Sequence, residues 1–175
     1  MDDNKKSEII AAYQVARQAV GGFDAILITL LTQGNPFVIA ILSIPFVATL
    51  NEAGTALITS LALLMSMLLF LANYIYWSLL AKSVRVSEEL ENALLNDFPE
   101  NMRLTFALNN IKLSAGKGSK FVYLLPPLVW ALAAIYTGWK SLGFATEKGI
   151  IFFLCCLLLA SIFLIIVTAF LKKEA

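Results

Sequence analysis

The fold is decided by residues 54–80, GTALITSLALLMSMLLFLANYIYWSLL, an apolar run that carries no charge. A bilayer hydrocarbon core about 30 Å thick needs about 20 helical residues to cross it, so this run is long enough for one tilted transmembrane helix. Residues 81–96, AKSVRVSEELENALLN, then mix charged with apolar side chains and contain no Pro or Gly. We therefore expect one continuous helix, with its first half in lipid and its second half in the cytosol.

The composition of the whole chain agrees with this reading. Of its 175 residues, 59% are hydrophobic and only 14% are charged, whereas soluble domains carry about 45–50% apolar and about 25% charged residues. We predict an all-α polytopic membrane protein with four transmembrane helices, an amphipathic N-terminal helix and a cytoplasmic helical extension between spans two and three. The expected segments are an N-terminal cytoplasmic segment (1–24), a transmembrane hairpin (25–80, spans 25–50 and 54–80), a cytoplasmic helical hairpin (81–119), a second transmembrane hairpin (120–171, spans 121–139 and 149–171) and a cytoplasmic tail (172–175).

The first span is the least regular part of the pattern. A helix is expected from Ser7, and Gly21-Gly22 is expected to break or bend it. Residues 33–36, Gln-Gly-Asn-Pro, interrupt the apolar run that follows, and Pro in a helix removes a hydrogen bond. Two readings stay open: one kinked span over 25–50, which we favour, or an amphipathic helix over 7–33 with the span beginning near Pro36.

Breaks elsewhere in the chain are expected at polar, Gly-rich and Pro-rich sites. Residues 51–54 predict a tight turn, 114–119 a linker and 140–148 a short external loop. Pro126-Pro127 is expected to unwind or kink the start of the third span. The start of the chain has no apolar stretch of signal-peptide type, so the first span is expected to serve as the insertion signal.

The orientation follows from the loop charges. Of the 13 Lys and Arg residues, only Lys140 and Lys148 fall on one side of the predicted membrane. Because cytoplasmic loops carry the excess of Lys and Arg, both termini and the 81–119 hairpin are predicted to be cytoplasmic. The expected location is the bacterial inner membrane, with multiple passes.

Two sets of side chains are candidates for function. Apolar stripes on the cytoplasmic hairpin would be exposed to water unless something buries them. This pattern predicts contacts with a partner protein or with another copy of the chain. These residues are Leu90, Leu94, Leu104, Leu108 and Ile111. The second set holds polar groups in the spans, which pack helices or line a pore. These residues are Gln33, Asn35, Ser60, Ser66 and Asn73.

Signs of catalysis or of cofactor binding are not expected. The chain has no His, and its two cysteines, Cys155 and Cys156, are adjacent inside an apolar run, where neither an ordinary disulfide nor a metal cluster is expected. The sequence Gly116-Lys117-Gly118 resembles a phosphate loop only superficially, because position 111 is Ile and a preceding strand is not expected. We predict no enzyme activity, no cofactor, no metal and no direct binding of nucleic acid.

In size and topology alone, the build resembles small four-span bacterial proteins such as colicin immunity proteins and the membrane components of phage-defence systems. That resemblance carries no motif and lends no residues. The expected function is an oligomeric membrane protein, a tetramer or dimer, whose cytoplasmic helices dock a soluble partner or signal and whose spans form or gate a pore, as in antiviral defence. The alternatives are a small-solute channel or transporter subunit, and an immunity or exclusion protein against a toxin or conjugation apparatus.

Overall fold

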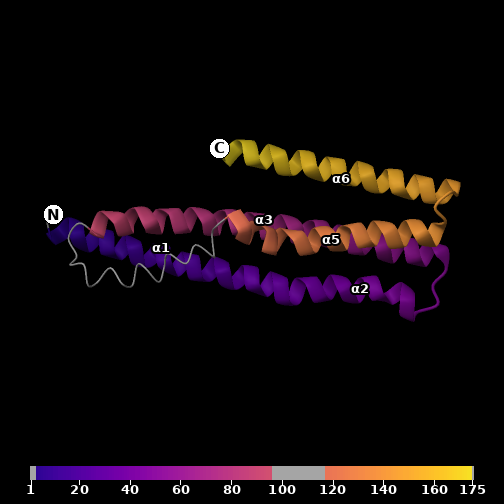
Figure 1. Ribbon diagram of the computed structural model, residues 1–175, viewed down its shortest axis with the longest axis horizontal. Helices are drawn as coiled ribbons and strands as arrows, with labels where there is room; N and C mark the ends of the chain where they lie inside the picture. The colour runs from indigo at the N-terminus through magenta and orange to yellow at the C-terminus, as the bar shows by residue number, and fades with distance from the viewer. Residues whose placement is uncertain (1–2, 96–116, 175) are drawn as a thin grey trace. The chain divides into compact units, whose positions relative to one another are not determined.

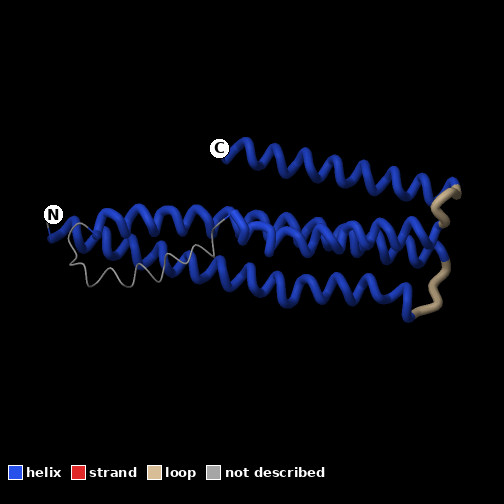
Figure 2. Tube along the Cα trace, in the orientation of Figure 1, coloured by secondary structure: helices blue, strands red, loops and turns tan. Residues whose placement is uncertain are grey.

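The chain is described by a computed structural model over residues 3–95 and 117–174, with side chains described at 4–94, 120–163 and 165. Within those ranges every regular element is a helix (Figure 1), and Figure 2 shows no strand among them. The all-α prediction is therefore confirmed. The elements are α1 (Asp3–Thr29), the π-helix η1 (Leu30–Gly34), α2 (Asn35–Val47), α3 (Glu52–Leu95), α5 (Lys117–Leu142) and α6 (Glu147–Glu174).

Three helical stretches among the described residues are long and apolar enough to span a membrane. They are Asn4–Val47, Glu52–Leu94 and Lys120–Leu142. Large apolar side chains face outward along them, including Val47 at 86% exposure and Leu57 at 70%. Water-soluble proteins rarely expose such extended apolar surface, so the helices are compatible with a membrane protein.

Helix α3 runs without interruption for 44 residues, which confirms that the apolar and the charged halves form one helix. Its N-terminus is capped by Asn51, whose Oδ1 accepts a hydrogen bond of 2.7 Å from the backbone N–H of Gly54. The tight turn predicted over 51–54 is therefore wrong in its extent. Glu52, Ala53 and Gly54 form the first turn of α3, because the Asn51 side chain satisfies a backbone donor that otherwise lacks a partner.

The helical path also continues through Gly21-Gly22, so the break predicted there is wrong. Helix α1 includes both glycines, and each costs only about 1 kcal/mol relative to alanine in a helix. The irregularity predicted at residues 33–36 takes the form of η1, a five-residue π-helix, followed directly by α2.

Helices α5 and α6 begin earlier in the chain than their predicted spans. Lys117–Ser119, predicted as part of a linker, belong to α5, and Pro126-Pro127 lie inside that helix without ending it. The loop predicted over 140–148 is shorter, because α5 continues to Leu142 and α6 starts at Glu147. Gly143 turns the chain between them with φ of +85°, a backbone conformation that suits glycine.

Internal contacts divide the chain into two units. Unit 1 comprises Met1–Leu30 and Asn73–Leu124, and in its described part α1 packs against the second half of α3. The rings of Phe23 and Tyr76, for example, lie 6.4 Å apart. The side chains of Leu27 and Leu80 are completely buried in this unit.

Unit 2 comprises Leu31–Ala72 and Leu125–Ala175. Its buried residues include small ones, such as Ala62 and Ala134, beside larger ones, such as Val38 and Leu63. A Cβ atom added at Gly138 on α5 would overlap the Phe152 ring of α6 and lie 2.7 Å from the Thr59 hydroxyl of α3. Three helices of this unit therefore meet closely at one glycine.

Candidate functional site

The five polar residues proposed for the spans are divided between the two units. Asn73 belongs to unit 1, whereas the other four belong to unit 2. Gln33 and Ser60 are exposed, and Asn35, Ser66 and Asn73 are buried. The Ser66 hydroxyl donates to the carbonyl of Ala62 in its own helix, at 2.8 Å. Their role in packing helices or in lining a pore stays a prediction.

Asn73 instead joins two helices of unit 1. Its Nδ2 donates a hydrogen bond of 2.8 Å to the backbone carbonyl of Tyr123 on α5. In a regular helix that carbonyl would accept from the N–H of residue 127, but residue 127 is Pro and has no N–H. Asn73 therefore supplies the donor that Pro127 removes, which lets α5 continue through its proline pair.

A second asparagine does the same locally in unit 2. In the i→i+5 pattern of a π-helix, the N–H of residue 36 would donate to the carbonyl of Leu31, and residue 36 is Pro. Asn35 Nδ2 donates to that carbonyl at 3.1 Å. Both buried asparagines are thus explained by a neighbouring proline, while Oδ1 of each has no hydrogen-bond partner among the described residues.

Polar and aromatic groups gather where α1, α3 and α5 meet in unit 1. The Tyr123 hydroxyl donates to the Asp24 carboxylate at 3.3 Å. The Lys120 ammonium lies 5.1 Å from the ring centre of Tyr74 and 4.9 Å from that of Trp77, within the range of cation–π attraction. Such aromatic and basic side chains are typical of a membrane interface.

The second half of α3 presents a buried seam to α1. Leu80, Ser87 and Leu94, spaced by seven residues, are exposed by 0%, 2% and 4%. Leu94 is thus already covered within the chain and Leu90 is half-buried, so a role for either in binding a partner stays a prediction. The other three residues of that predicted set, Leu104, Leu108 and Ile111, lie outside the described residues.

A carboxylate also lies in this seam. Burial raises the pKa of Glu91 above its ordinary value, Arg17 of α1 opposes that rise, and Glu88 adds to it. Arg17 also lies 5.9 Å from the ring centre of Tyr13. A titratable group therefore faces the contact between two helices.

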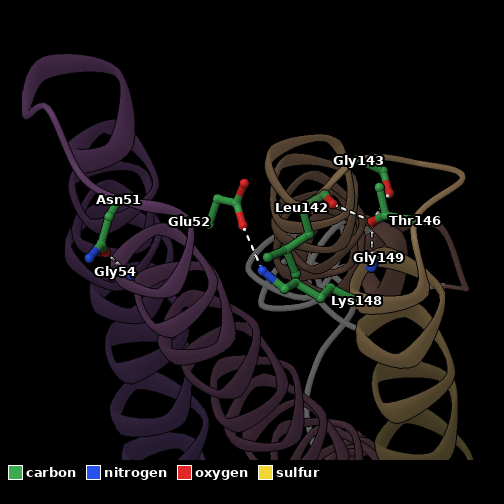
Figure 3. A network of polar contacts seen from close by, with 8 residues as sticks. All are labelled: Asn51, Glu52, Gly54, Leu142, Gly143, Thr146, Lys148 and Gly149. Atoms are coloured by element: carbon green, nitrogen blue, oxygen red, sulfur yellow. Dashed lines mark hydrogen bonds and ion pairs between the residues drawn. The ribbon is translucent and has the colours of Figure 1, made fainter.

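Unit 2 holds a groove that the sequence analysis missed. It has a volume of about 740 Å³ and lies among the start of α3, the end of α5 and the first turns of α6. Glu52 and Lys148 both line it, and Figure 3 shows these two side chains facing each other, with Nζ of Lys148 3.2 Å from Oε2 of Glu52. Apolar side chains dominate the remaining lining, including Leu142, Ile151 and Phe152.

The signal for this groove was present in the chain, because Glu52 and Lys148 carry opposite charges beside the two turns predicted on the same side of the membrane. Spacing alone does not show that these side chains meet. An exposed ion pair of this kind contributes about 0–1 kcal/mol, so it does little to hold the helices together. The remaining space beside it is available to a ligand.

The described residues were also inspected for clusters of possible metal ligands. Among the described residues, no group of three or more His, Cys, Asp or Glu side chains could hold a metal ion. Both cysteines are free; Cys155 is exposed and Cys156 is buried. Comparisons of the chain with models of protein families, with curated proteins and with solved structures find no match.

Proposed function

We propose that the chain is a non-enzymatic, homo-oligomeric protein of the bacterial inner membrane, with four spans and both termini in the cytoplasm. Its cytoplasmic helices dock a soluble protein or receive a signal. In response the transmembrane spans of the assembled copies form or gate a pore in the bilayer. The antiviral setting of this proposal rests only on the resemblance in size and topology to membrane components of phage-defence systems.

The observation that carries this proposal is the continuity of α3 over 44 residues. At 1.5 Å per residue such a helix is about 66 Å long, roughly twice the thickness of a hydrocarbon core of about 30 Å. Its first half exposes apolar side chains such as Leu57, and its second half exposes charged ones such as Arg85 and Glu89. A rigid element that reaches from lipid into water is suited to transmit a displacement.

The ends of the helices in unit 2 support an even number of spans. Glu52 in the first turn of α3 lies 3.2 Å from Lys148 in the first turn of α6, so these two turns are close in space. The turns before α3 and before α6 therefore lie at the same end of unit 2, as expected for alternating spans. With only two of the 13 Lys and Arg residues near these turns, this end is the external one.

Self-association is supported by Gln33. Its amide is exposed on η1 and has no hydrogen-bond partner among the described residues. An amide that faces hydrocarbon without a partner is costly, and hydrogen bonds between spans contribute about 0.6–1.7 kcal/mol. A second copy that presents the same surface satisfies both amides, which favours a dimer or tetramer.

The orientation is tested with a reporter that is active only in the cytoplasm. Fused after Ala175 it is expected to be active, and inserted between Gly143 and Thr146 it is expected to be inactive. The reverse pattern would overturn the assignment of a cytoplasmic docking surface.

Oligomerisation is tested by native mass spectrometry of the purified chain. Gln33→Leu is expected to shift the dimer or tetramer toward monomer, whereas Ser43→Ala, which changes an exposed polar position outside the candidate set, leaves it unchanged. A wild-type chain that is monomeric in lipid nanodiscs contradicts the proposal.

Conduction is tested in liposomes that contain only this chain. Ion flux without any added partner would favour the alternative of a constitutive solute channel, since the proposed protein stays closed until its cytoplasmic helices are engaged.

A further inference from the structure

We propose that the groove beside Glu52 and Lys148 in unit 2 binds one zwitterionic phospholipid whose headgroup carries a primary ammonium. This inference rests on the membrane placement proposed above. It assigns a ligand to a site that the docking and pore proposals do not use.

The shape and lining of the groove indicate an amphiphile. Its volume of about 740 Å³ falls in the range of small-molecule sites, about 300–1,000 Å³. Ile151, Phe152 and Cys155 on α6 and Leu142 on α5 line its apolar part. Charged groups lie only at its edge, so one end of the ligand is expected to be polar and the rest apolar.

The charges at the edge select the headgroup. The ammonium of Lys148 is expected to pair with a phosphate, and the carboxylate of Glu52 with a cation. The two side chains are 73% and 62% exposed, so a ligand can reach both. A primary ammonium has three N–H donors for the carboxylate, whereas a quaternary choline group has none.

Two backbone donors at the helix N-termini beside the groove are already used within the chain. The backbone N–H of Gly54 donates to Asn51 Oδ1 at 2.7 Å, and that of Gly149 donates to Thr146 Oγ1 at 3.1 Å (Figure 3). The charged group that we assign to the phosphate is the side-chain ammonium of Lys148, which lines the groove.

A second cavity of unit 2 lacks this combination. It has a volume of about 200 Å³, and apolar side chains of α3, α5 and α6, among them Phe70 and Leu128, surround it together with Ser66. Without a charged edge, it offers a headgroup no partner. The larger groove is therefore the lipid site.

The test is native mass spectrometry of the full chain, released from nanodiscs made with either phosphatidylethanolamine or phosphatidylcholine. Wild type is expected to retain one phosphatidylethanolamine per chain, roughly fivefold more than phosphatidylcholine. Ala53→Trp, which fills the groove, is expected to lose this retention, while Ala40→Trp, at an exposed position on α2, keeps it. Glu52→Gln is expected to bind both lipids equally.

A second measurement uses the thiol that lines the groove. In a Cys156→Ser chain, phosphatidylethanolamine is expected to slow maleimide labelling of Cys155 severalfold more than phosphatidylcholine does, and Ala53→Trp abolishes that difference. Equal retention and equal labelling with the two lipids would overturn the lipid site. The reporter fused after Ala175 tests the membrane placement independently, so failure of one proposal is distinguishable from failure of the other.

Discussion

The two halves of α3 expose opposite kinds of side chain. In its first half, Thr59, Ala62 and Ser66 are fully buried, while Leu57 is 70% exposed. In its second half, Leu80 and Leu94 are buried, and charged residues such as Arg85 face outward. The exposed side chains therefore change from apolar to charged along a single helix.

The membrane placement that we propose accounts for this difference. In lipid, large apolar residues gain nothing by turning inward, so they stay exposed. In water, burial of large apolar side chains is favourable and charged side chains stay exposed. Under this proposal, the change in the exposed side chains is expected where α3 leaves the bilayer.

The largest effect is expected from Leu94→Ala. Removal of a buried leucine in the half that we propose to face water leaves a cavity, which lowers the free energy of unfolding by about 2–5 kcal/mol. The same substitution at Leu57, in the lipid-facing half, is expected to change it by less than about 0.5 kcal/mol. Thermal unfolding of both variants in nanodiscs measures the pair, and equal losses would contradict the proposed change of solvent along α3.

Gly138→Ala tests the small-residue packing of unit 2. An added Cβ meets Phe152 and Thr59, so overpacking is expected to cost about 1–3 kcal/mol. Gly21→Ala is the matched control, because a Cβ there meets nothing within 4 Å and alanine favours the helix by about 1 kcal/mol. Unfolding in nanodiscs is expected to move in opposite directions for the two variants, and a stabilised Gly138→Ala chain would show that the close approach is absent.

The hydrogen bond from Asn73 to the Tyr123 carbonyl is tested with a double-mutant cycle. Asn73→Leu is expected to lower the free energy of unfolding by about 0.6–1.7 kcal/mol, the range measured for hydrogen bonds between spans. In a Pro127→Ala background, residue 127 regains the N–H that bonds the same carbonyl, and the loss is expected to shrink toward zero. Equal losses in both backgrounds would show that Asn73 does not compensate for Pro127.

Some features of these helices could be predicted from the sequence, and others could not. The continuity of α3 was predictable, because residues 55–95 contain no Pro or Gly and the apolar pattern runs on. The persistence of α5 through Pro126-Pro127 was not, because it depends on Asn73, a residue about fifty positions away that only the fold brings near. The break at Gly21-Gly22 was wrong for a related reason, since local propensity is a weak guide where a helix has a packed neighbour.

The groove was unpredictable for the same physical reason. Glu52 and Lys148 could be assigned to one side of the membrane from their places beside the turns. Their separation of 3.2 Å depends on how α3 and α6 pack, which neither residue encodes alone. The sequence identified Asn35 and Asn73 as polar residues within the spans. It did not predict that each would donate a hydrogen bond to a backbone carbonyl.

The smallest expected effect concerns Glu91 in the seam between α1 and α3. Its pKa is raised in the folded chain, mainly by burial, so the folded state holds the proton more tightly than the unfolded state does. The stabilisation from protonation is therefore complete below the ordinary pKa of the carboxyl and is lost as pH rises through the raised value. Unit 1 is expected to become less stable as the pH is raised from about 4 to 7.

Glu91→Gln removes that titration while keeping a side chain of similar shape, so its stability is expected to vary less with pH than that of wild type. Glu89→Gln, at an exposed position paired with Arg85, keeps the wild-type dependence and serves as the control. Hydrogen exchange of the α1 and α3 backbone across this pH range measures the difference. A wild-type dependence that survives in Glu91→Gln would place the responsible group elsewhere, and would leave the seam between α1 and α3 without a titrating member.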